Sequence, residues 1–273
     1  METGNLSGIE VSLMKNAIID AHIHLDMYEE CERNQLLNEL DMYKVEKVIA
    51  VSTDYQSALT NLEYSKQNKK IKPAAGFHPE QPLPEEAELQ KLFSLIERKK
   101  NEIVAIGEVG LPYYLRKEQK QLSLNSYIEI LEVFVKYAAK TGKPIALHAI
   151  YEDAEIVCDL LERYSVSNAH FHWFKGSEKI LQRMKENGYF VSFTPDCLYE
   201  EEIKRIIKSY PIELMMAETD GPWPFAGPFS GELTHPKMIH SSIKQISRLK
   251  NVPMQDVYSR FFKNTSIFYD LQE

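Results

Sequence analysis

Histidine and carboxylate side chains recur near the ends of separate apolar runs in this sequence. Imidazole nitrogens and carboxylate oxygens are the usual protein ligands of zinc, manganese and iron. A carboxylate inside an apolar run is costly to bury alone, and a bound cation would give it a partner. Six such residues form the predicted metal-binding set: His22, His24, Glu108, His148, His172 and Asp220.

His22 and His24 are separated by one residue at the end of the first apolar run. Side chains alternate along a strand, so both imidazoles project to the same side and can chelate one ion. A single pair of this kind is more often structural than metal-binding. The alternative for the whole set is a group of unrelated buried polar residues, each with its own hydrogen-bond partner, and the recurrence on five runs favours the metal site.

Six ligands suit two cations better than one. Glu108 is the predicted bridge, because its carboxylate has two oxygens and the residue lies in the middle of the set. We expect two divalent ions, either zinc, manganese or magnesium, about 3.5–4 Å apart, that activate a water for hydrolysis. Asp220 would bind one ion and orient or deprotonate that water. The predicted catalytic residues are Asp220, Glu108 and His78.

The remaining histidines near these ends require a choice of role. His170 and His172 share a side by alternation, and we place His172 in the metal set because it lies nearer the end of its run. His170 is then a buried packing residue. His78 ends the third run, and we predict that it donates a hydrogen bond to substrate, with loop capping as the alternative. Lys175 and Trp223 lie in loops that could reach substrate, although surface or packing roles are the simpler interpretation.

Eight short apolar runs could bring these side chains to one place. Most are rich in Val, Ile, Ala and Phe and lack strict polar alternation, which is typical of strands buried on both faces. Stretches with helical periodicity separate them, such as Ser126–Lys140. The runs are Ala17–Leu25, Val45–Ser52, Ile71–His78, Ile103–Leu111, Pro144–Ile150, Ala169–Phe174, Tyr189–Pro195 and Leu214–Gly221.

Strands that alternate with helices predict parallel pairing, and eight such units in 273 residues predict a closed (β/α)8 TIM barrel. An open doubly wound sheet is the alternative. In a barrel the C-terminal ends of the strands gather around one mouth, so the metal-binding set would converge there. The Pro- and Gly-rich segment from Gly221 to Gly231 is expected to cover the mouth. Two helices, about His235–Lys250 and Met254–Asp270, would complete the fold.

Composition and charge narrow the function classes. Hydrophobic residues make up 44% and charged residues 26%, and no apolar run approaches the roughly 18 residues that span a bilayer. The net charge of −8 argues against a broad basic face for duplex nucleic acid, although bound cations would attract a phosphate end. Three widely spaced cysteines indicate neither a disulfide framework nor a cysteine metal site, so we expect a cytoplasmic protein.

The domain organisation is predicted to be simple. Residues 1–16 lack the basic start and apolar core of a secretory signal, and the first strand pattern begins near Met14. We therefore interpret residues 1–16 as an N-terminal extension of native or non-native origin. Residues 17–273 are expected to form one metal-dependent hydrolase barrel, since no linker or internal repeat divides them, and no obligate protein partner is indicated.

The order of these motifs resembles the TatD family of metal-dependent hydrolases, usually described as TatD-related DNases, within the amidohydrolase superfamily. Any one motif is weak, but seven in order at matching intervals form a strong signal. The resemblance runs from about Ala17 to the end of the chain. The matching segments are Asp20–Leu25, Gly76–Pro79, Ala105–Leu111, Lys143–His148, His172–Ser177, Glu218–Trp223 and Asn264.

The resemblance implies a (β/α)8 barrel of amidohydrolase type with divalent-metal phosphodiesterase activity, often 3′–5′ exonuclease action on DNA. It matches the metal residues of the family to all six members of the predicted set and favours His172 over His170. The expected partner is therefore a DNA 3′ end or a small phosphodiester substrate.

This sequence departs from the family pattern around the pocket. Ile150 follows His148 by two residues where arginine is common, Pro112 replaces an aspartate, and Gly231–Pro236 replaces an Arg-Asn-x-Pro stretch. Loss of a guanidinium removes a bidentate phosphate donor. Two alternatives therefore stay open: metal-dependent hydrolysis of a small ester, lactone or amide, and a metal-binding protein without catalytic activity.

Overall fold

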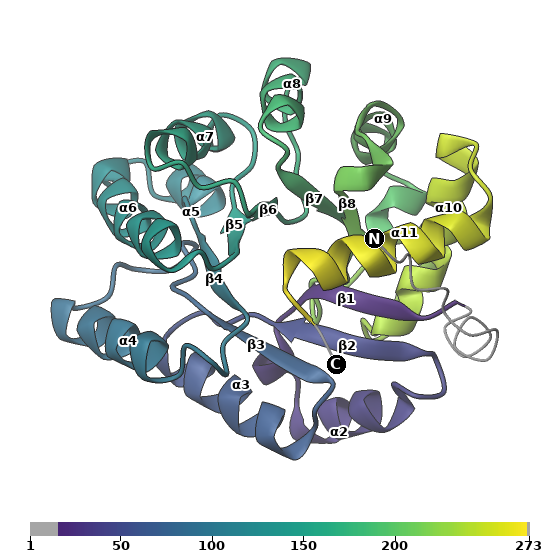
Figure 1. The fold of residues 1–273 in the computed structure, drawn as a ribbon, viewed down its shortest axis with the longest axis horizontal. Coiled ribbons are helices and arrows are strands. Elements are labelled where there is room, and N and C mark those ends of the chain that lie inside the picture. The colour runs from purple at the N-terminus through teal and green to yellow at the C-terminus, as the bar shows by residue number, and fades with distance from the viewer. Residues whose placement is uncertain (1–15, 272–273) are drawn as a thin grey trace, which may run out of the picture.

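The computed structural model describes residues 16–271, and within that range eight parallel strands pair in chain order from β1 to β8 (Figure 1). Beyond β8, Asp220 N donates to His22 O and His24 N donates to Gly221 O, which joins the last strand end to the first. The predicted barrel is confirmed and the open sheet is excluded. The strands are β1 Ile18–Ile23, β2 Val45–Ala50, β3 Ile71–Ala75, β4 Ala105–Gly110, β5 Ile145–His148, β6 Ala169–Phe171, β7 Phe190–Phe193 and β8 Met215–Ala217.

Helices form an outer ring around these strands (Figure 1). The α-helices are α2 Glu30–Glu39, α3 Tyr55–Gln67, α4 Glu86–Arg98, α5 Tyr113–Glu118, α6 Leu124–Thr141, α7 Asp153–Arg163, α8 Glu178–Glu186, α9 Glu201–Ser209, α10 Ile239–Lys250 and α11 Met254–Phe268. Short 3-10 turns are η1 Leu25–Met27, η2 Pro195–Leu198, η3 Ile212–Leu214, η4 Gly227–Phe229 and η5 Pro236–Met238. Among the described residues no helix is both long enough and apolar enough to cross a membrane.

The helix α6 shows why the sequence pattern folds in this way. Its buried residues, such as Leu131, Val135 and Ala138, recur at intervals of three and four and so face the strands. The helix ends at Gly142, whose φ of 69° lies in the left-handed region and whose N–H bonds to Ala138 O. The helix predicted at Ser126–Lys140 is therefore confirmed, with both ends slightly extended.

The end of α11 fills the barrel interior on the side opposite the mouth. Phe268, Tyr269 and Leu271 belong to one buried cluster with inward-facing strand residues. Ile19 and Ala105, near the starts of β1 and β4, are in this cluster, so the chain end closes the N-terminal floor of the barrel. The other end, where the strands finish, is left open for a site.

Several predicted boundaries were too long. His24, His172 and Asp220 were predicted inside strands but lie just after β1, β6 and β8, because the backbone leaves the sheet where it turns into the mouth loops. The helix predicted from His235 begins instead as the η5 turn, since Pro236 follows and the His235 side chain accepts a hydrogen bond from Lys237 N. The predicted extension, residues 1–16, lies outside the described residues except for its last member.

Candidate metal centre

Glu108 lies on β4 at the middle of the mouth and is fully buried. Its Oε2 is 3.1 Å from Nε2 of both His22 and His24. Its Oε1 is 2.9 Å from His148 Nδ1 and 2.7 Å from His172 Nε2. Each oxygen of one carboxylate therefore faces a different pair of imidazoles, and the pairs come from different strands.

Asp220 completes the half of the site that contains Oε2. Its Oδ1 is 3.5 Å from His22 Nε2 and 3.4 Å from His24 Nε2. The residue follows β8 with a φ of 49°, in the left-handed region that aspartate tolerates better than most residues. The backbone hydrogen bond from Asp220 N to His22 O fixes this turn against the end of β1. The structure thus brings together all six residues of the predicted metal-binding set.

Close packing of the strands at Glu108 depends on glycine. A Cβ at Gly110 would lie 1.9 Å from His148 O, and one at Gly76 would lie 2.5 Å from Glu108 O. Both distances are far below van der Waals contact, so only glycine lets β3, β4 and β5 approach closely here. This approach carries the side chains of Glu108 and His148 to hydrogen-bond distance.

The residues present fit divalent cations. Nδ1 of His148 and Nε2 of His172 are 3.2 Å apart, and the rings of His22 and His172 stack with centroids 3.9 Å apart. Asp220 Oδ1 is buried without a hydrogen-bond donor among the described residues. Nitrogen and oxygen lone pairs that converge in this way repel one another unless a positive charge lies between them, and imidazole with carboxylate is the ligand chemistry of zinc and manganese.

Protons and cations compete at this centre. Burial acts to lower the pKa of His24, but its contacts with Asp220 and Glu108 raise that pKa to about 10. Burial also opposes the charged form of Glu108, yet the positive charge of His172 and other nearby histidines holds its pKa well below the ordinary value. Because a metal ion needs the same imidazole lone pairs as the proton, metal binding will release protons.

His78 occupies the rim of the centre with a defined tautomer. Its Nδ1 accepts a hydrogen bond from Glu80 N at 3.2 Å, so the ring proton belongs on Nε2, which lies 3.5 Å from Glu108 Oε1. Burial lowers the pKa of His78 to about 4, although the charge of Glu108 opposes this shift. A neutral ring with an inward Nε2–H is suited to donate a hydrogen bond.

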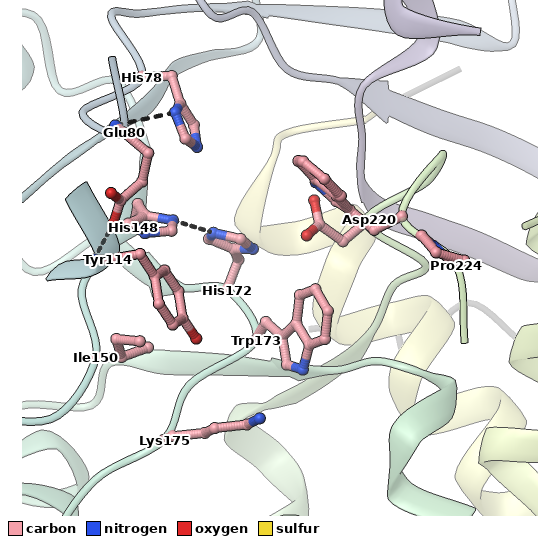
Figure 2. Close-up of a pocket in the computed structure, with 11 residues that line it drawn as sticks. His78, Glu80, Tyr114, His148, Ile150, His172, Trp173, Lys175, Asp220 and Pro224 are labelled. Atoms are coloured by element: carbon pink, nitrogen blue, oxygen red, sulfur yellow. Dashed lines mark hydrogen bonds and ion pairs between the residues drawn. The ribbon is translucent and has the colours of Figure 1, made fainter. Parts of the chain in front are cut away.

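A cavity of about 420 Å³ opens above the centre (Figure 2). Its base is formed by His78, Glu80, His148, His172 and Asp220, and its walls by Tyr114, Ile150, Trp173, Lys175, Trp223 and Pro224. Lys175 and Trp223, for which packing or surface roles were the simpler interpretation, both line this cavity. Because Trp223 and Pro224 belong to the segment predicted to cover the mouth, that segment forms part of the wall.

Comparison with known proteins decides the family. The family model for TatD-related DNase matches residues 19–270. This chain belongs to the TatD family of metal-dependent hydrolases. It is 37% identical to an uncharacterized metal-dependent hydrolase of Haemophilus influenzae, over 93% of this chain and 100% of that protein. It is 23% identical to the human deoxyribonuclease TATDN3, over 88% of this chain and 90% of that protein.

A solved TatD structure supports the fold. The crystal structure of YJJV, a TatD homologue from Escherichia coli K12, superimposes with a TM-score of 0.85 and 21% sequence identity. The match covers 95% of this chain and 100% of that one. At this identity the likeness establishes the barrel architecture, and the chemistry has to be argued from the residues themselves.

Two carboxylates around this TatD centre were missed in the sequence. Glu80 Oε1 lies 3.1 Å from His148 Nε2. Glu218 accepts a hydrogen bond from Trp173 N at 2.7 Å, and its Oε1 lies 3.7 Å from His172 Nδ1. Glu80 follows His78 by two residues and Glu218 precedes Asp220 by two, so proximity to residues already singled out was the signal available for each.

His170 lies below the TatD centre. Its Nδ1 is 2.7 Å from the Tyr269 hydroxyl on the C-terminal segment, and its Nε2 is 2.5 Å from Ser192 Oγ. Both ring nitrogens therefore have partners within the protein, and the ring is fully buried. These contacts agree with the interpretation of His170 as a structural histidine.

Proposed function

We propose that this TatD protein is a phosphodiesterase that hydrolyses DNA 3′ ends or small phosphodiesters with two divalent cations. The proposal rests mainly on the arrangement at Glu108, where Oε2 faces His22 and His24 and Oε1 faces a second pair of histidines, His148 and His172. Paired cations across one carboxylate suit in-line displacement at phosphorus. The human relative named a deoxyribonuclease supports the same substrate class.

The residues divide into two ligand groups in this proposal. His22, His24 and Asp220 would hold one cation together with Glu108 Oε2, and His148 and His172 would hold the other with Oε1. Zinc, manganese or magnesium fits these donors. When bound, such cations lower the pKa of water and offset negative charge on the phosphoryl oxygens.

The protein side chains supply the proton transfers and orientation. Asp220, at the base of the cavity, accepts a proton from the attacking water as the water oxygen bonds to phosphorus. The bond from phosphorus to the leaving alcohol breaks, and the leaving oxygen takes a proton from solvent. His78 donates its Nε2–H to a phosphoryl oxygen, a role that its neutral state and fixed tautomer allow.

The cavity walls favour a strand end over a duplex. Tyr114 and Trp223 are 49% and 48% exposed, and aromatic faces beside a cavity can stack nucleobases. Lys175 brings one positive charge to the wall, whereas the chain as a whole carries −8. Binding a long duplex needs a wide basic surface, so a single terminal nucleotide fits this charge distribution better.

A substrate panel tests the proposal. Purified protein loaded with zinc, manganese or magnesium would be assayed on single-stranded oligonucleotides with free or blocked 3′ ends, on a generic phosphodiester, and on lactones and amides. We expect cleavage of the free 3′ end and of the generic phosphodiester, with no turnover after chelation. Turnover of lactones or amides without any phosphodiester cleavage would contradict the proposal.

The same panel decides the second candidate, a hydrolase of small esters, lactones or amides. Ile150 favours it, because this apolar side chain lines the cavity at the position where arginine is common in the family and would bind phosphate. The third candidate, a catalytically silent metal-binding protein, requires bound metal and no turnover of any substrate in the panel.

A further inference from the structure

His148 is oriented differently from the other histidines of the centre. His22, His24 and His172 turn Nε2 toward Glu108, whereas His148 turns Nδ1 toward it. The outward Nδ1 atoms of the first three are buried and have no hydrogen-bond partner within residues 16–271. The outward Nε2 of His148 alone among the four is within hydrogen-bond distance of a carboxylate, that of Glu80 at 3.1 Å.

Glu80 is itself held in place by backbone donors. Its Oε1 accepts from Tyr114 N at 2.9 Å and its Oε2 accepts from Leu115 N at 2.6 Å, both at the start of α5. Its own N–H donates to His78 Nδ1. With its carboxylate fixed at both oxygens, Glu80 presents an acceptor to His148 in one position, and Figure 2 shows Glu80 between His78 and His148 at the edge of the cavity.

We infer that Glu80 is a positioning residue that sets the tautomer of His148. Because Oε1 accepts the Nε2–H of His148, the lone pair of Nδ1 is directed at Glu108 Oε1 and His172, where the proposed second cation would lie. A carboxylate on the far side of a ligating histidine also makes that histidine a stronger donor. The same Glu80 oxygen ties the backbone of Tyr114, a wall residue of the cavity, to this metal ligand.

The inference predicts unequal effects on the two cations. Loss of such an outer carboxylate typically weakens metal binding by about 10–100-fold. Glu80 contacts only one of the two ligand groups, the pair His148 and His172, and does so through His148. Glu80→Gln should therefore lower the affinity for the cation of that group by about 10–100-fold and change the affinity for the other cation by less than about threefold. The inference depends on metal ligation by His148 and not on the substrate class.

A control variant separates positioning of His148 from support of α5. Arg116 on α5 pairs with the buried Asp153 of α7, a second link that ties this helix to the barrel without touching His148. Arg116→Gln therefore loosens α5 in another way. If Glu80 acts only by holding α5, the two variants should weaken the metal centre equally.

The experiment is a calorimetric titration of Mn²⁺ and Zn²⁺ into the apo forms of the full chain, Glu80→Gln and Arg116→Gln. We expect two binding steps in the full chain, selective weakening of one step in Glu80→Gln, and both steps retained in Arg116→Gln. Unchanged affinities in Glu80→Gln, or equal losses in both variants, would overturn the inference.

A measurement on the unaltered protein covers the case in which Glu80→Gln does not fold. Nitrogen-15 NMR of the zinc-loaded protein should show the proton of His148 on Nε2, with Nδ1 unprotonated. A proton on Nδ1 would overturn the inference. If the metal titration behaves as expected and the substrate panel shows no hydrolysis, the proposed function fails while the role of Glu80 stands.

Discussion

At the scale of single residues, the proposed chemistry depends on the side chains that surround the carboxylate of Glu108. Five histidines lie within 3.5 Å of its two oxygens, and Asp220 Oδ1 lies within 3.5 Å of two of them. None of these side chains is strongly exposed. A buried polar cluster of this kind is stable only when every charge has a partner. The folding of the barrel mouth should therefore depend on whether cations occupy the centre.

Asp220→Asn is predicted to reduce turnover by about 10²–10⁴-fold, because an amide cannot accept the proton from the attacking water. The fold should remain, since asparagine has the same size and also tolerates the left-handed backbone of this position. Steady-state assays at saturating metal and a thermal melt would measure both effects. Asp41→Asn, a change at an exposed carboxylate paired with Lys70, serves as the control. Unchanged turnover in metal-replete Asp220→Asn would refute this role.

His235 gives a pH dependence that is independent of the metal centre. Burial, followed by the nearby charge of Lys237, lowers its pKa to about 4 from an ordinary value of 6.5. The folded protein therefore binds this proton less readily than the unfolded chain does. The contribution of His235 to the unfolding free energy is therefore fully present above pH 6.5, and it is lost as the pH falls from 6.5 towards 4.

His235→Asn removes this titration and keeps an acceptor for Lys237 N. Between pH 7 and pH 4, the unfolding free energy of the original protein should fall by about 3 kcal/mol more than that of the variant. Urea unfolding in the presence of a chelator, at several pH values, measures the difference. Parallel pH profiles for the two proteins would show that His235 does not contribute.

The six metal-binding candidates could be found in the sequence because residue type and position at a strand end were enough. Glu80 could not, because its partner His148 is 68 residues away and meets it only when the loop after β3 folds over β5. Alternation gave His170 and His172 the same side, so the choice of His172 depended on its position nearer the end of the run and on the family resemblance. The partners of His170, Tyr269 and Ser192, could not be predicted.

At the scale of elements, the approach of neighbouring strands is set by glycine. Gly110→Ala would place a Cβ 1.9 Å from His148 O, so β4 and β5 would have to separate. We expect a loss of about 2–4 kcal/mol in unfolding free energy. Gly142→Ala is the matched control, because it meets no atom within 4 Å and strains only its positive φ, at a cost of about 1 kcal/mol. Denaturant unfolding would measure the loss of unfolding free energy in both variants. An equal loss in Gly110→Ala and Gly142→Ala would contradict this explanation.

The elements themselves were largely readable from periodicity. The eight strands and the helix α6 lie where apolar runs and helical spacing placed them. Their ends were less accurate, since the sequence does not show where a strand leaves the sheet. Register irregularities in β1 between Asp20 and Ile23, and in β4 between Ile106 and Val109, depend on contacts with neighbouring strands and could not be predicted.

At the scale of the whole molecule, metal and fold should be coupled. Ligand binding to the folded state alone stabilises a protein by about 3–4 kcal/mol when the free ligand is at 100–1,000 times Kd. We therefore expect chelation to lower the melting temperature and re-addition of zinc or manganese to restore it. Circular dichroism would follow the thermal unfolding of the apo and the metal-loaded protein. Identical melts with and without metal would contradict the coupling.

The closed barrel was predictable because eight alternating units leave few other arrangements. The plug formed by Phe268, Tyr269 and Leu271 was not, because it depends on the chain returning beneath strands that are far away in the sequence. The hydrogen bond between Tyr269 and His170 shows the same dependence on distant segments. Long-range closure of this kind leaves no local pattern in the sequence.

The central claim is that Glu108 bridges two cations. Anomalous X-ray diffraction from crystals grown with manganese tests it most directly. We expect two peaks about 3.5–4 Å apart, one beside Glu108 Oε2 with His22, His24 and Asp220, and one beside Oε1 with His148 and His172. A mouth without any peak, or a single peak that contacts only one oxygen of Glu108, would contradict the claim.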